Sequence, residues 1–154
     1  MFWLADEIAP PRTCVLKWTR QVGTAAVAAM ERVPEVVWRQ RDRAHYLTYD
    51  ESVNEAGGHV RTTLRLESDA LTWIRHGLVT WRHTFRVGEK HHSEMQIGGQ
   101  RVGMDTETHF LAIEIEPSGG RVEVVYDMQM DGESQRVRLK FNFHEGEIDG
   151  AEQG

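Results

Sequence analysis

Polar side chains interrupt several rows of apolar residues that recur at every second position of this sequence. Arg75 falls in the same row as Leu71 and Trp73, and His83 follows Trp81 in another. The other polar members of such rows are Arg20, Thr62 and Tyr126. Because a guanidinium pairs with two oxygens of a carboxylate or phosphate at once, side chains in these positions could bind a small anion.

A buried charge without a partner is costly, so the arginines in these rows need a counterpart. Few acidic residues are expected to share their face. Arg20 and Arg75 must therefore reach a carboxylate, the solvent or an anionic ligand. The ligand hypothesis names the candidate binding residues Arg75, His83, Arg20, Tyr126, Thr62, Trp73 and Trp81.

The same residues also have ordinary structural interpretations. An arginine near a strand end commonly buries its stem and keeps its guanidinium in water, and this is the more common interpretation of Arg75. Tyr126 reads as an amphipathic core tyrosine. The tryptophans either fill a core or line a pocket.

No motif for catalysis, metal or cofactor binding accompanies these residues. His91 and His92 are adjacent, so on a strand they point to opposite faces. The sequence has no His-Glu-x-x-His motif, no cysteine pair and no Gly-x-Ser-x-Gly elbow, and its glycine pairs lack the lysine of a phosphate loop. We therefore expect no metal, no cofactor and no catalytic residue, and a non-enzymatic protein is favoured.

The elements that must position these side chains are strands. Between Tyr46 and Phe143 apolar and polar residues alternate with a period of two, which is typical of half-buried strands. Turn residues such as those at 98–99 and 117–120 separate the runs. The pattern predicts an all-β protein, a single antiparallel barrel of about 8–10 strands. Residues 100–106 and 110–116 are predicted as two separate strands.

One segment departs from the alternation. Residues 24–32 are rich in alanine and start at Thr24, a suitable helix N-cap, so we expect a short helical turn there that Pro34 closes.

Length and charge limit the remaining options. The chain has 154 residues, which suits one domain: a flexible leader at 1–12, a barrel at 13–145 and an acidic disordered tail at 146–154. The net charge of −6 argues against nucleic acid or an anionic membrane as a partner. The acidic start and the single cysteine, Cys14, favour a cytoplasmic protein. A homodimer could form through any edge strand left unpaired.

Several segments keep the order and approximate spacing of a known pattern. They are residues 46–51 (YLTYDE), 62–64 (TTL), 74–77 (IRHG) and 82–85 (RHTF), the last followed by Gly88-Glu89. Over residues 35–145 the chain resembles the YwiB-like bacterial family, a domain of unknown function. The resemblance implies a calycin-like, lipocalin-type β-barrel and no established activity. The chain departs from the family pattern at His76, where Ser is common, and at His83, where Gln is common.

These observations lead to two functional hypotheses. The first is a cytoplasmic barrel that binds a small, anionic ligand in its interior. The alternative is a structural or protein-interaction module whose barrel is filled by its own side chains and holds no ligand. A closed barrel of this size either fills with side chains or holds one small ligand, so the interior distinguishes the two.

Overall fold

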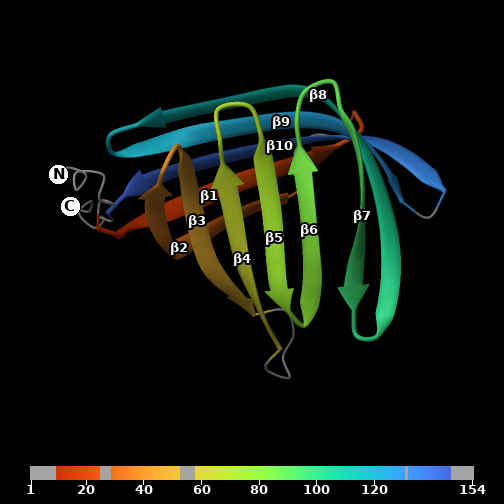
Figure 1. Cartoon of the computed structure of the whole chain (residues 1–154), viewed down its shortest axis with the longest axis horizontal. Coiled ribbons are helices and arrows are strands. Elements are labelled where there is room, and N and C mark those ends of the chain that lie inside the picture. The colour runs from red at the N-terminus through yellow and green to blue at the C-terminus, as the bar shows by residue number, and fades with distance from the viewer. Residues whose placement is uncertain (1–9, 25–28, 53–57, 131, 147–154) are drawn as a thin grey trace.

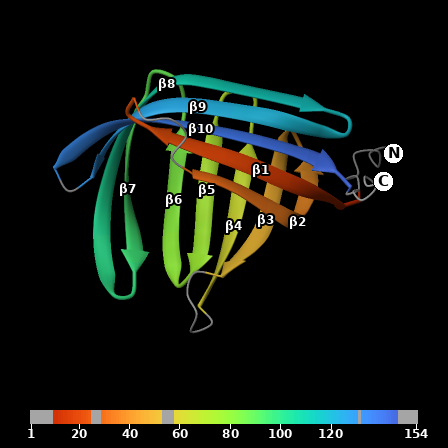
Figure 2. The same cartoon turned by 180° about the vertical axis from the view of Figure 1, so that it is seen from behind.

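The computed structural model describes residues 10–24, 29–52, 58–130 and 132–146 and arranges them as a closed barrel. Figures 1 and 2 show its ten strands from two sides. The strands are β1 (Arg12–Val22), β2 (Ala29–Arg41), β3 (Ala44–Ser52), β4 (His59–Leu66), β5 (Leu71–Gly77), β6 (Val79–Phe85), β7 (Lys90–Ile97), β8 (Gln100–Glu116), β9 (Gly119–Met130) and β10 (Glu133–Glu145). The predicted all-β antiparallel barrel is confirmed. The described residues contain no helix long and apolar enough to span a membrane.

Each strand pairs antiparallel with the next strand in the sequence, and β1 pairs with β10 to close the ring. The predicted turn at Gly98-Gly99 joins β7 to β8, and both glycines have positive φ angles, 53° and 85°. Such angles are those of a two-residue hairpin turn and favour glycine. Figure 1 shows that β8, β9, β10 and β1 cross β3–β6 at a steep angle, so the barrel is flattened.

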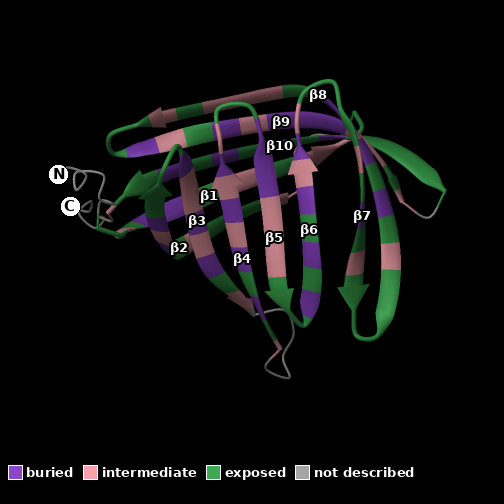
Figure 3. Cartoon of the chain, viewed as in Figure 1, coloured by how far each residue is buried: buried purple, intermediate pink, exposed green. Residues whose placement is uncertain are grey.

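Side-chain alternation divides the barrel into a wet exterior and an apolar interior, as Figure 3 shows along β4 and β6. One end of the interior is packed solid, and we call it the closed end. Its largest buried side chains include Trp38 and Phe143, whose rings meet edge to face at 4.9 Å. The Arg12 guanidinium lies 3.6 Å from the centre of the Trp38 ring and donates to the Pro117 carbonyl at 2.6 Å.

The expected helical turn at 24–32 is wrong where the structure describes it. Residues 29–32 belong to β2 and pair with β1, and Thr24 lies in a turn; residues 25–28 lie outside the described residues. Pairing with β1 satisfies the backbone better than a helix too short to be stable alone, so tertiary context overrides the alanine propensity. Pro34 ends no helix but occupies a register shift of β2, where a missing N–H is tolerated.

Two strands that the sequence predicts separately form a single strand in the structure. Residues 100–106 and 110–116 are both part of β8, which continues through a register shift between Thr108 and Phe110. A bulge adds a residue and bends a strand without ending it. The interruption between the two predicted strands is thus a bulge in one long strand.

At two places in the closed sheet, which we call seams, neighbouring strands share few backbone pairs. β6 and β7 pair only through Val79–Ile97 and Thr80–Gln96. β2 pairs with β3 only over Val37–Arg41, so among the described residues its first half pairs with β1 alone. Side chains rather than backbone bonds must hold the rest of these seams.

Candidate ligand-binding cavity

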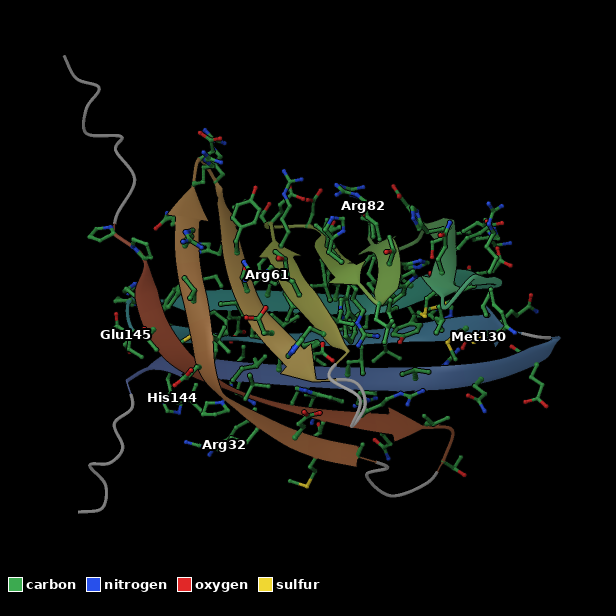
Figure 4. The ribbon with its side chains drawn as sticks, turned by 90° about the horizontal axis from the view of Figure 1, so that it is seen from below. Arg32, Arg61, Arg82, Met130, His144 and Glu145 are labelled. Atoms are coloured by element: carbon green, nitrogen blue, oxygen red, sulfur yellow. The ribbon has the colours of Figure 1, made fainter. Side chains whose placement is uncertain are left out.

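The barrel is hollow at the end opposite the packed core, which we call the open end. Figure 4 shows the two ends on opposite sides, with Met130 at the open end and Glu145 at the closed end. The hollow has a volume of about 350 Å³ and is not fully enclosed. Its lining residues come from nine strands and are Trp18, Arg20, Glu31, Tyr49, Glu51, Trp73, Arg75, Trp81, Met95, Met104, Tyr126, Met128, Met130 and Leu139.

The structure brings five of the seven candidate residues together at this cavity. They are Arg20, Arg75, Trp73, Trp81 and Tyr126. Thr62 on β4 does not line the cavity but is fully buried and paired in register with Arg75. His83 does not line the cavity either and lies in the seam between β6 and β7.

The protein itself supplies a partner for Arg75. Arg75 Nη2 donates to Glu51 Oε1 at 2.9 Å, and the Thr62 hydroxyl donates to Glu51 Oε2. Glu51 continues the inward row of Leu47 and Tyr49 on β3. The expectation of few inward carboxylates was therefore wrong at this point, and the alternation of β3 could have shown it.

Two donors in the cavity wall have no acceptor. The Nε–H of Arg75 and the indole N–H of Trp73 are both buried and unpaired within the described part of the chain. An unsatisfied buried donor costs about 1–3 kcal/mol. These groups mark the wall as richer in donors than in acceptors.

Exposed charges lie where the cavity meets solvent. Arg20 on β1 and Glu31 on β2 are both exposed, and among the described residues neither has an ion-pair partner within 4.0 Å. Arg20 sits diagonally from Glu31 across the two strands, because Arg20 pairs with Ala29. Burial raises the pKa of Tyr126 to about 12, while the charge of nearby Arg20 opposes that rise.

The apolar part of the wall consists mainly of tryptophans and methionines. The rings of Trp73 and Trp81 lie 5.5 Å apart at a tilt of 51°. Four of the six methionines in the chain line the cavity: Met95, Met104, Met128 and Met130. Sequence reasoning missed this group, although all four occupy inward positions of β7–β9. A thioether is flexible and polarizable, so such a wall adapts its shape to what it contacts.

His83 holds the seam where β6 and β7 lack backbone pairing. Its Nδ1 lies 2.6 Å from Ser93 Oγ on β7, and its Nε2 lies 2.7 Å from Thr106 Oγ1 on β8. The Trp81 indole donates to the same Ser93 oxygen at 2.8 Å. Each ring nitrogen therefore has a hydroxyl partner, and the neutral imidazole donates to one hydroxyl and accepts from the other.

The environment of His83 disfavours its protonated form. The ring is fully buried, and this burial, with His91 and His92 nearby, lowers its pKa to about 3, against a smaller opposing effect of Asp105. A neutral, doubly hydrogen-bonded histidine is a structural clamp. It is not poised to take up protons at neutral pH.

Other titratable groups lie outside this cavity. Burial raises the pKa of the Cys14 thiol to about 11, so it is not an activated nucleophile. His92 bonds Asp105 at 2.8 Å on the outer face. Within residues 10–24, 29–52, 58–130 and 132–146, no three His, Cys, Asp or Glu side chains are grouped as metal ligands would be.

Comparisons with known proteins find one matching family and two solved structures with similarity to this barrel. The profile of the family described as Domain of unknown function (DUF1934) matches residues 19–141. The crystal structure of the ywiB protein from Bacillus subtilis is similar, with a TM-score of 0.79 and 15% identity over 94% of this chain and 99% of that one. A Bacteroides ovatus protein of unknown function is far less similar: its TM-score is 0.33 and its identity 8%, over 88% of this chain and 41% of that one. No curated protein matches. The first likeness shows the shared fold.

Proposed function

The chain belongs to the family described as Domain of unknown function (DUF1934), and we propose that this member binds one small molecule in the open end of its barrel. The observation that carries the proposal is the uneven filling of the interior. One end is packed by its own aromatic and aliphatic side chains, whereas the other leaves about 350 Å³ inside a wall contributed by nine strands.

The composition of the wall supports this function. Small-molecule sites are concave, mostly apolar and furnished with a few convergent polar groups. The open end has this composition, because tryptophans and methionines surround the bonded pair Arg75–Glu51. That pair gives the ligand a polar wall without requiring it to neutralise Arg75.

The alternative, an interaction module with a filled barrel, is favoured only by the closed end. It gives no reason for the unpaired donors of Trp73 and Arg75 beside an unfilled space. A cytoplasmic location, and the expectation that nucleic acid and membranes are not partners, stay predictions from the sequence.

Native mass spectrometry of protein purified gently from the cells that make it tests the proposal. We expect a population heavier than the chain by one small molecule, and we expect denaturing conditions to release that mass. A matched sample exhaustively dialysed against an apolar resin serves as the control and should lose the added mass. The bare chain mass in every preparation, together with no uptake from a library of small organic compounds, would oppose a binding function.

A further inference from the structure

In the cavity wall, some buried hydrogen-bond donors have no partner, whereas the buried carboxylate acceptors already bond to other side chains of the protein. Both carboxylate oxygens of Glu51 are occupied, one by Arg75 and one by Thr62. The indole N–H of Trp73 and the Nε–H of Arg75 remain buried without an acceptor. A ligand that enters this space gains most if it brings acceptor oxygens, because they remove the cost of unsatisfied donors.

The positively charged side chain of Arg20 lies where the same cavity meets solvent. Arg20 lines the cavity, is exposed, and has no carboxylate within 4.0 Å among the described residues. Its planar guanidinium can bind two oxygens of one acid group. Glu31, diagonally across β1 and β2, is the one opposing charge that is not already bonded in the cavity lining, and it reduces the attraction of an anion.

The apolar walls favour a flat ring over a flexible chain. Trp73 and Trp81 present tilted rings 5.5 Å apart, and Trp18 belongs to the same lining. The same lining contains the four cavity methionines, whose sulfurs make favourable contacts with aromatic rings. Aromatic ligands gain offset or edge-to-face contacts with such a wall beyond the area they bury.

Resting on the proposed binding function, we propose that the ligand is a flat aromatic acid of about bicyclic size. Its ring contacts the tryptophans and the methionines. Its acid group faces Arg20 and the unused donors of Trp73 and Arg75. The ligand class thus follows from three properties of the wall: free donors, one unpaired cation, and aromatic and thioether surfaces.

Three probes of similar size separate the contributions of charge and ring. They are 2-naphthoate, neutral 2-naphthamide and the saturated acid decahydro-2-naphthoate, titrated by isothermal calorimetry at constant salt. We expect wild-type protein to bind the naphthoate about tenfold more tightly than the amide, since one charged hydrogen-bonding contact distinguishes them. The saturated acid should bind several-fold more weakly than the naphthoate, about as expected for lost ring contacts.

Charge variants locate the acid group. Arg20→Gln should bring the ratio of acid to amide affinity close to one, whereas Glu31→Gln should raise it about two- to fivefold. Arg32→Gln is the matched control, because Arg32 is exposed on β2 beside Glu31 but on the outer face, as Figure 4 shows, and its ratio should stay that of wild type.

The outcomes separate this inference from the function on which it rests. If the amide binds as tightly as the acid, or if Arg20→Gln leaves the ratio unchanged, the aromatic-acid class is wrong while the binding cavity stands. If the saturated acid equals the naphthoate, the requirement for a ring is wrong. If none of the three probes binds, the aromatic-acid class is wrong, and the binding function is then tested by the native mass spectrometry and the compound library alone.

Discussion

At pH 7.5, replacing His83 by leucine lowers the free energy of unfolding by about 2–4 kcal/mol. The substitution removes the clamp between β6 and β7, where only two residue pairs link the strands through their backbones. It leaves the buried hydroxyls of Thr106 and Ser93 without their hydrogen bonds to the imidazole. Urea denaturation followed by tryptophan fluorescence measures the change.

The same variant changes how stability depends on pH. The pKa of His83 is about 3 in the folded protein and near 6.5 in the unfolded chain, so below 6.5 the unfolded state binds more protons. The contribution of neutral His83 is therefore complete above pH 6.5 and is lost as the pH falls toward 3. Within that window the contribution of His83 to the free energy of unfolding falls by about 1.4 kcal/mol per pH unit.

The wild-type and His83→Leu stability curves should therefore converge as the pH is lowered from 6.5 toward 4. His76→Leu is the matched control, because His76 is exposed near the end of β5 and is not among the groups that shift the pKa of His83, so it should change stability by less than about 1 kcal/mol. Curves that stay parallel across the whole range would show that His83 is not held neutral by its burial.

Filling the cavity by substitution should abolish ligand binding without unfolding the barrel. Met128 lines the cavity and is half-buried, so Met128→Trp places an indole in the open space. We expect the affinity for 2-naphthoate to fall at least about a hundredfold, because the added ring and the probe compete for one volume. The free energy of unfolding should change by less than about 1.5 kcal/mol, because the indole has room.

Met30→Trp makes the identical change at a residue that is 75% exposed and does not line the cavity. It should bind 2-naphthoate as wild type does, with both affinities measured by calorimetry. Undiminished binding by a folded Met128→Trp variant would place the bound molecule elsewhere.

The sequence was most informative where side-chain direction depends only on the alternation of a strand. Arg75, Trp73 and Tyr126 follow from the period of two, and the structure places all three at one cavity. Their role in binding a ligand stays a prediction. The barrel itself followed from many short alternating runs separated by turn residues.

What the sequence did not provide was pairing across strands. Arg75 meets Glu51 because β4 lies between β5 and β3 and brings Thr62 alongside both. Residues that are 24 positions apart show no such relation in a linear pattern. The helix expected at 24–32 failed for a related reason, since alanine propensity is weak beside the pairing of residues 29–32 with β1.

The tryptophan side chains provide the most direct test of the central claim, that the open end of the barrel binds a small molecule. Trp18, Trp73 and Trp81 line the cavity, whereas Trp38 is 1% exposed in the closed end and donates to His45 at 3.0 Å. In a nitrogen-edited NMR titration of wild-type protein with 2-naphthoate, the indole N–H signals of the three cavity tryptophans should move and saturate together. The Trp38 signal should stay in place. Cavity signals that do not move at saturating probe, or a Trp38 signal that moves as far as they do, would contradict a binding site at the open end.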